Sequence, residues 1–138
     1  MRRSIILSLA LLSFSLCTNA QSPNTDPIDK TLNDCLNDPK NKDIQMQTGC
    51  MAKAFIAWEV KIQDLRDSIK LIAEPEDLLL INSNHKEWQE YYETENRLIS
   101  TELSKDISDS SKIKYFKYMI LFARRRAADL EELIERRK

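Results

Sequence analysis

The chain has 138 residues, and its 21 basic and 22 acidic side chains give it a formal net charge of −1. This length supports one domain with one modest core, and the near-neutral charge gives no support for nucleic-acid binding, which requires a clustered basic surface. After the N-terminal segment, no apolar run approaches the roughly 20 residues that cross a bilayer, so we expect a soluble protein once that segment is removed.

The N-terminal segment has the pattern of an export signal. Arg2 and Arg3 give a basic start, residues 5–16 form an apolar run, and residues 18–20 offer the small side chains that a signal peptidase recognises. We expect residues 1–20 to be the signal peptide, with cleavage after Ala20. Cleavage removes two basic residues and no acidic ones, so the formal charge moves from −1 to about −3. We therefore expect the mature protein to be periplasmic or secreted.

Two cysteines remain after cleavage, because Cys17 leaves with the signal. Lipid attachment at Cys17 is an alternative, but Leu16 stands where a small residue is expected. Paired cysteines in an exported chain indicate a disulfide, here between Cys35 and Cys50. A metal site or a catalytic thiol is the rival explanation, and the lack of a nearby histidine disfavours the metal. Closing a loop of about 15 residues stabilises a fold by about 3 kcal/mol.

The N-terminal part of the mature chain predicts short elements. Residues 21–27 contain two of the four prolines and are expected to form a flexible lead-in. Residues 28–36 predict a short helix, and residues 38–41 carry a turn signal around a proline. Asn41 or Asp43 can then cap a longer helix, because a short polar side chain accepts from free N–H groups of the first turn.

Apolar residues spaced mostly three or four apart predict the first long helix, because this spacing places them on one face. This first stripe is Met51, Ala54, Phe55, Trp58, Ile62, Leu65, Ile69 and Ile72. Gly49 lies near the start of the helix, where it costs about 1 kcal/mol relative to alanine. Pro75 ends this helix or begins the next, because the missing N–H of proline has no partner in a first helical turn.

Two further stripes predict two more long helices, separated by a polar turn at residues 108–111 that offers several capping side chains. The second stripe is Leu78, Ile81, His85, Trp88, Tyr92, Leu98, Ile99 and Leu103, and the third is Ile113, Phe116, Ile120, Ala123, Ala127, Leu130 and Ile134. We therefore predict that residues 28–138 form one all-α domain. It is expected to be an antiparallel bundle of three long helices plus a short N-terminal helix, with one disulfide.

The side chains that carry catalysis in other proteins have structural explanations here. His85 is the only histidine and lies on an apolar stripe without an accompanying nucleophile, which favours a core or boundary position over a general base. Trp58 and Trp88 are expected in the core. Residues 124–126 are three arginines followed by acids at helical spacing, which favours a solvated charged face. With no phosphate loop, metal-ligand spacing or nucleophile motif, we predict no enzyme, no metal and no cofactor.

Several residues occur in an order that resembles one known family. In chain order these residues are Cys35, Cys50, Ala54, Trp58, Glu59, Ile62, Gln63, Trp88, Tyr91, Arg126 and Leu130. This order is similar to the LprI-type lysozyme inhibitor family, small exported helical proteins of bacteria, over residues 28–134. The chain departs from the family at Arg66, His85 and Tyr92, where tyrosine, glutamine and arginine are usual.

The resemblance implies a periplasmic protein that inhibits lysozyme, or another peptidoglycan hydrolase, by occluding its cleft. Exposed acidic turns suit a basic enzyme, so the expected contacts lie in the two turns between the long helices. They are Glu74, Glu76 and Asp77 in the first turn, and Asp106, Asp109 and Ser110 in the second. Two alternatives stay open: an immunity protein against a secreted cell-wall hydrolase, and a periplasmic interaction or stress module without an enzyme target.

Overall fold

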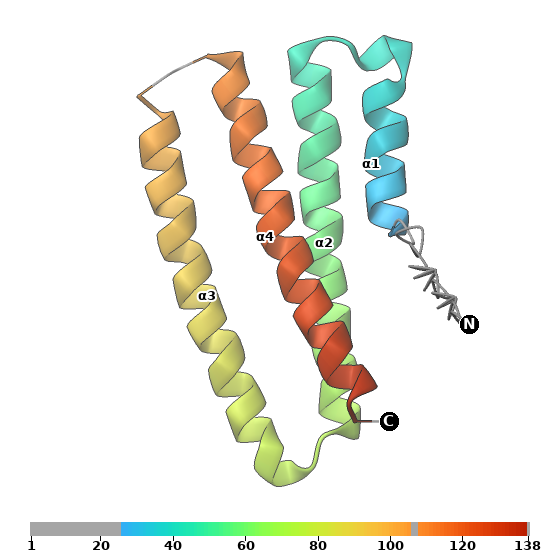
Figure 1. Cartoon of the computed structure of the whole chain (residues 1–138), viewed down its shortest axis with the longest axis vertical. Helices are drawn as coiled ribbons and strands as arrows, with labels where there is room; N and C mark the ends of the chain where they lie inside the picture. Colours follow the sequence, from blue (N-terminus) through green and yellow to red (C-terminus); the bar gives the residue numbers. More distant parts are fainter. Residues whose placement is uncertain (1–25, 106–107, 138) are drawn as a thin grey trace, which may run out of the picture.

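The computed structural model describes residues 26–105 and 108–137, and every regular element within them is a helix. The elements are α1 (Pro27–Asn37), the short 3-10 helix η1 (Pro39–Asn41), α2 (Ile44–Ile72), α3 (Pro75–Leu103) and α4 (Asp109–Glu135). Successive helices α1 to α4 run in opposite directions (Figure 1). The predicted all-α class, with three long helices and a short N-terminal one, is confirmed. The expected signal peptide lies outside the described residues.

Proline and aspartate set the starts of the helices. Pro27 occupies the first position of α1, and the carboxylate of Asp26 accepts a hydrogen bond of 2.9 Å from the N–H of Ile28. Helix α1 therefore begins one residue before the predicted start at residue 28, because proline is preorganised for a first helical turn. Asp43 caps α2 by accepting from the N–H of Gln45 at 3.2 Å, as the sequence predicts.

The predicted disulfide between Cys35 and Cys50 is present, with the two Cα atoms 5.9 Å apart. It joins the last turn of α1 to the second turn of α2. The side-chain amide of Asn41 donates to the carbonyl oxygen of Cys35 at 2.8 Å, so Asn41 fixes the connection rather than capping α2. Both contacts hold α1 alongside the first half of α2 (Figure 1).

The core lies mainly between α2 and α4, which run side by side in the same direction (Figure 1). Its buried members are Met51, Ala54, Trp58, Ile62 and Ile69 from α2, and Ile120, Ala123, Ala127 and Leu130 from α4. Three apolar residues of α1 cover one side of this pair: Ile28, Leu32 and Leu36. The stripes predicted for the first and third long helices therefore supply the two halves of the core, except that Ile72 at the end of the first stripe is 46% exposed.

The middle long helix, α3, is held less closely. It contacts α4 over a smaller surface than α2 does, and among its described residues only His85 is buried. Ile81 and Trp88 are half-buried against the core, whereas Leu98 is 56% exposed. Its predicted stripe is thus buried at the centre and open near its C-terminal end.

Ion pairs tie α1 to both core helices. The ammonium of Lys61 on α2 lies 2.5 Å from the carboxylate of Asp26 and 2.6 Å from that of Glu131 on α4. Arg124 on α4 lies 2.5 Å from Asp29 on α1. Such partly exposed pairs each contribute about 1 kcal/mol or less, so they set the position of α1 more than they stabilise the fold. Within residues 26–105 and 108–137, no helix combines the length and apolar character needed to cross a lipid bilayer.

Candidate functional site

The first group of expected contact residues lies where α2 meets α3. Glu74 and Glu76 are exposed there, on either side of Pro75. Asp77 is only half-exposed, because its carboxylate accepts a 2.8 Å hydrogen bond from the guanidinium of Arg137 near the end of α4. Two of the three predicted acids therefore face solvent without an ion-pair partner within the described residues, while the third joins α3 to α4.

The second group lies at the other end of α3. Asp109 forms an exposed ion pair of 3.4 Å with Lys112, and the hydroxyl of Ser110 lies 3.0 Å from that of Ser108. Asp106 lies outside the described residues. The two groups mark opposite ends of the molecule (Figure 1), and at 1.5 Å per residue the 29 residues of α3 separate them by about 43 Å. The six residues therefore do not form one surface.

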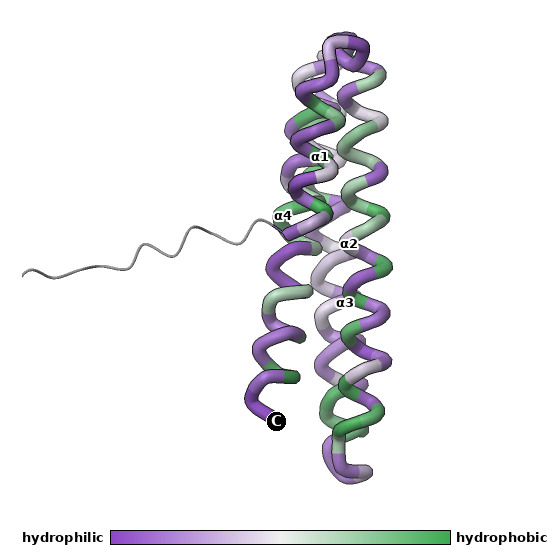
Figure 2. Tube along the Cα trace, turned by 90° about the vertical axis from the view of Figure 1, so that its right-hand side faces the viewer, coloured by the Kyte–Doolittle hydropathy of each residue, from purple (hydrophilic) through white to green (hydrophobic). Residues whose placement is uncertain are grey.

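Large apolar side chains are exposed around the α2–α3 turn, a feature that the sequence analysis missed. They are Leu71 at 87% exposure, Leu79 at 79%, Leu80 at 71% and Ile72 at 46%. Figure 2 shows hydrophobic segments in this end of the molecule, next to a polar turn. The signal in the sequence was the unbroken apolar run at residues 78–81, because one face of a helix cannot bury four consecutive residues. We call these four side chains, with Glu74 and Glu76, the α2–α3 tip.

A cavity of about 520 Å³ lies between α2, α3 and α4 near the same end. Its walls are formed by Arg66, Leu80, Ile81, Asn84, His85, Arg126, Asp129, Leu130, Leu133 and Arg137. We call it the basic cavity, because three arginines line it and Asp129 is its single lining carboxylate. None of its residues was singled out as a binding residue from the sequence.

Arg126 departs most from expectation in the basic cavity. It was predicted on a solvated charged face but is only 7% exposed. Its guanidinium donates to the side-chain oxygen of Asn84 at 3.0 Å and lies 5.4 Å from the ring centre of Trp88. The sequence did carry a signal, since Arg126 stands three residues after Ala123 and four before Leu130 and so falls on their buried stripe.

His85 is 5% exposed, which confirms the predicted core position. Burial lowers the pKa of its imidazole to about 4, and the nearby charges of Arg66, Arg126 and Lys70 act in the same direction. At neutral pH the ring is uncharged.

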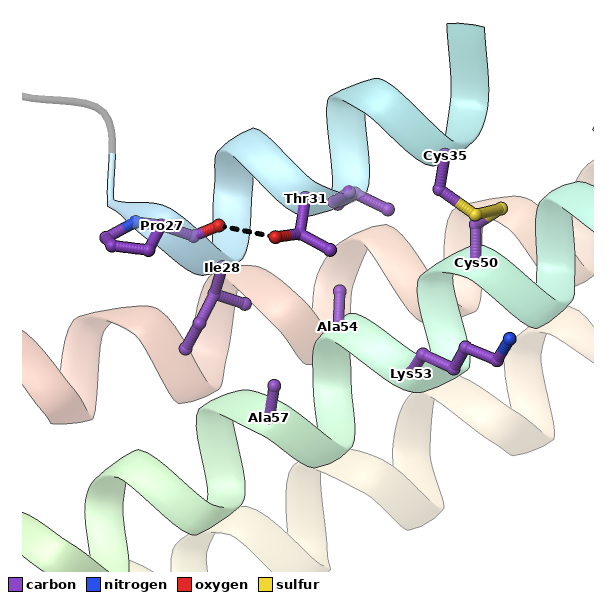
Figure 3. Close-up of a pocket in the computed structure, with 9 residues that line it drawn as sticks. Pro27, Ile28, Thr31, Cys35, Cys50, Lys53, Ala54 and Ala57 are labelled. Atoms are coloured by element: carbon purple, nitrogen blue, oxygen red, sulfur yellow. Dashed lines mark hydrogen bonds between the residues drawn. A yellow bond between two sulfur atoms is a disulfide. The ribbon is translucent and has the colours of Figure 1, made fainter. Parts of the chain in front are cut away.

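A second, smaller cavity of about 240 Å³ lies between α1 and α2 beside the disulfide. Figure 3 shows apolar side chains and the two sulfur atoms on its walls, with the side chain of Lys53 extending along α2. The hydroxyl of Thr31 is engaged by the carbonyl oxygen of Pro27 at 2.9 Å. Lys53 is the one charged residue that lines this cavity, and the Thr31 hydroxyl is already engaged, so the lining offers little for a polar ligand to bind.

The described residues contain no group of three or more His, Cys, Asp or Glu side chains arranged to hold a metal ion. Comparison of the chain with protein-family models, with curated proteins and with solved structures found no match. The candidate surfaces are therefore judged by their own geometry. They are the α2–α3 tip and the basic cavity.

Proposed function

We propose that the protein is an exported binding protein that inhibits a lysozyme-type peptidoglycan hydrolase by placing the α2–α3 tip in or against its cleft. In this proposal an antiparallel bundle of the three long helices is the scaffold, and residues 1–20 direct the chain to the periplasm. The resemblance to the LprI-type family motivates the choice of target.

One observation supports the tip as the contact surface. Exposed Leu71 and Leu79 lie within about two helical turns of Glu74 and Glu76. Protein interfaces combine an apolar centre with a polar rim, and exposed apolar clusters on small proteins commonly mark partner sites. Acids at the rim favour a basic partner through faster association. The α3–α4 end offers only Leu98 as a large exposed apolar side chain in the described residues.

The tip also has a suitable shape for occlusion. It is a narrow end formed by the connection of two helices (Figure 1), and the ion pair of Asp77 with Arg137 fixes α3 to α4 close to it. A fixed narrow end can enter a cleft with little loss of conformational entropy, which favours binding.

The test is a lysozyme assay with the oxidised exported protein. Hydrolysis of bacterial cell walls is followed by turbidity for chicken-type, goose-type and invertebrate-type lysozymes. We expect one type to be inhibited at micromolar inhibitor, with inhibition weakening as salt rises because the acidic rim contributes to association. Full activity of all three enzymes at micromolar excess contradicts the proposal.

Paired variants assign the inhibition to the tip. Leu71→Ser with Leu79→Ser removes apolar contacts from two side chains that contribute nothing to the core, so we expect the inhibition constant to rise about tenfold or more. Met46→Ser with Leu98→Ser is the matched control, because these side chains are also at least half exposed but lie away from the tip. Equal inhibition by both double variants would place the contact surface elsewhere.

A further inference from the structure

The basic cavity contains more positive charge than the described residues neutralise. Arg66, Arg126 and Arg137 line it, and Asp77 engages only Arg137. Asp129 also lines the cavity, but it forms no ion pair with any of the three arginines in the described part of the chain. A buried guanidinium without a carboxylate partner costs desolvation free energy. Of the three arginines, Arg126 would therefore be stabilised most by a bound anion.

Hydrogen-bonding groups around the cavity are also left over. The Nε–H groups of Arg126 and Arg137 and the Nδ1 of His85 are buried without a hydrogen-bond partner among the described residues. Buried polar groups in native proteins are nearly always satisfied, and a missing ligand is one explanation for an exception. Three of the four side chains with such a group among the described residues line this one cavity, and the fourth is Trp58.

Two of the arginines act on each other. Burial lowers the pKa of Arg126, and the positive charge of Arg66 lowers it further while Asp129 opposes both effects. An anion held between Arg66 and Arg126 would relieve this repulsion. Arginine suits this role because its planar guanidinium binds a carboxylate through two parallel hydrogen bonds.

Part of the cavity lining is aliphatic. It consists of Leu80 and Ile81 from α3 and of Leu130 and Leu133 from α4, and such a surface gains by contact with an apolar ligand body. The cavity volume of about 520 Å³ falls within the range of about 300–1,000 Å³ typical of small-molecule sites. An inorganic anion would leave this aliphatic wall unused.

We propose that the basic cavity binds a small organic monocarboxylate with an apolar body, whose carboxylate lies between Arg66 and Arg126. A singly charged head group is favoured over a phosphate because Asp129 shares the cavity and repels a second negative charge. The apolar body lies against Leu130 and Leu133. Leu80 lines this cavity and also belongs to the α2–α3 tip, but no hydrolase is needed to test binding of the carboxylate.

Isothermal titration of the oxidised exported protein tests the proposal with three probes. Octanoate carries the carboxylate and an apolar chain, 1-octanol carries the chain alone, and inorganic phosphate carries the charge alone. We expect saturable one-site binding of octanoate, at least tenfold tighter than binding of either other probe. No saturable octanoate binding up to millimolar concentration overturns the proposal. If 1-octanol binds as tightly as octanoate, the carboxylate contributes nothing and the proposal is wrong. If phosphate binds more tightly than octanoate, the ligand is a phosphate and not a carboxylate, which also contradicts the proposal.

Variants then place the carboxylate. Arg66→Met is the first choice because Arg66 is half-buried and outside the core cluster, so the fold is expected to survive. We expect it to weaken octanoate binding about tenfold and to leave binding of 1-octanol unchanged. Arg136→Met is the matched control, since Arg136 is exposed, pairs with Glu132 and does not line the cavity. Unchanged octanoate affinity in Arg66→Met would show that the carboxylate does not lie there.

Discussion

At the scale of single residues, His85 illustrates how neighbouring charges define a site. The imidazole is buried among cations contributed by α2 and α4, with Arg66 and Lys70 on one helix and Arg126 on the other. Trp88 stacks on it from within α3, with ring centres 5.6 Å apart. Protonation would add a fourth positive charge in a place with little solvent, which explains why the pKa falls to about 4.

We predict that His85 makes the protein sensitive to acid. Its pKa is lower in the folded state than the ordinary value of 6.5, so the unfolded chain binds more protons between pH 6.5 and 4. Stability therefore falls as pH drops through this window, by about 2 kcal/mol between pH 7 and pH 5 for this group alone. Urea unfolding at the two pH values measures the loss, and His85→Gln is expected to remove that share of it. The same pH dependence in both proteins would contradict the prediction.

The sequence predicts the position of a residue correctly where one local rule decides that position. Asp43 caps a helix, Pro75 begins one, and His85 is buried, because each follows from helical spacing or from the chemistry of a first turn. Arg126 was misplaced because three consecutive arginines resemble a solvated face, although only one of them lies on the buried stripe. Which charges meet across helices, as Arg66 and Arg126 do, depends on tertiary distances that no local pattern contains.

At the scale of the helices, the sequence predicts where each helix begins and ends. It predicts burial well for α2 and α4 but not for all of α3. The stripes of α2 and α4 form the core as expected. The stripe of α3 is only partly buried. Its spacing of three or four residues holds from Leu78 to Tyr92 and breaks before Leu98, and α3 has a smaller interface with α4 than α2 has.

Gly49 offers a direct test of helix propensity in α2. It lies inside the helix with an ordinary helical backbone, and a Cβ atom added there meets no atom within 4 Å. We predict that Gly49→Ala raises the free energy of unfolding by about 0.5–1 kcal/mol, because alanine restricts the unfolded chain without introducing a clash. Urea denaturation of the oxidised protein measures the gain. A loss of stability would show that this part of α2 needs the smaller residue.

At the scale of the whole molecule, the helices form an unequal assembly. α2 and α4 contribute six and seven buried residues, whereas α3 contributes one of the buried residues among its described positions. The disulfide and two ion pairs, Lys61 with Asp26 and Arg124 with Asp29, attach α1 and its N-cap to the pair formed by α2 and α4. α3 is connected to α4 by Asp77 with Arg137 and by two tyrosine hydroxyls of α4, which donate to Asn96 and Glu95 at 2.8 Å each.

We predict from this inequality that α3 opens before the rest of the fold. Local opening exposes little apolar surface where few side chains are buried, so its free-energy cost is low. Hydrogen exchange at neutral pH, read by mass spectrometry on the oxidised protein, is expected to show amides at the centre of α3 exchanging about tenfold or more faster than those of α2 and α4.

Two alanine variants separate local opening of α3 from global unfolding. Leu130→Ala removes a buried core contact of α4 and is expected to cost about 2–4 kcal/mol and to speed exchange throughout α2 and α4. Leu98→Ala changes an exposed residue of α3 and is expected to leave exchange in α2 and α4 unchanged. If α3 exchanges at the same rate as α2 and α4 in the parent protein, the three helices unfold as one cooperative unit. The basic cavity would then have three equally stable walls, and binding of an anion would protect all three helices alike instead of slowing exchange chiefly in α3.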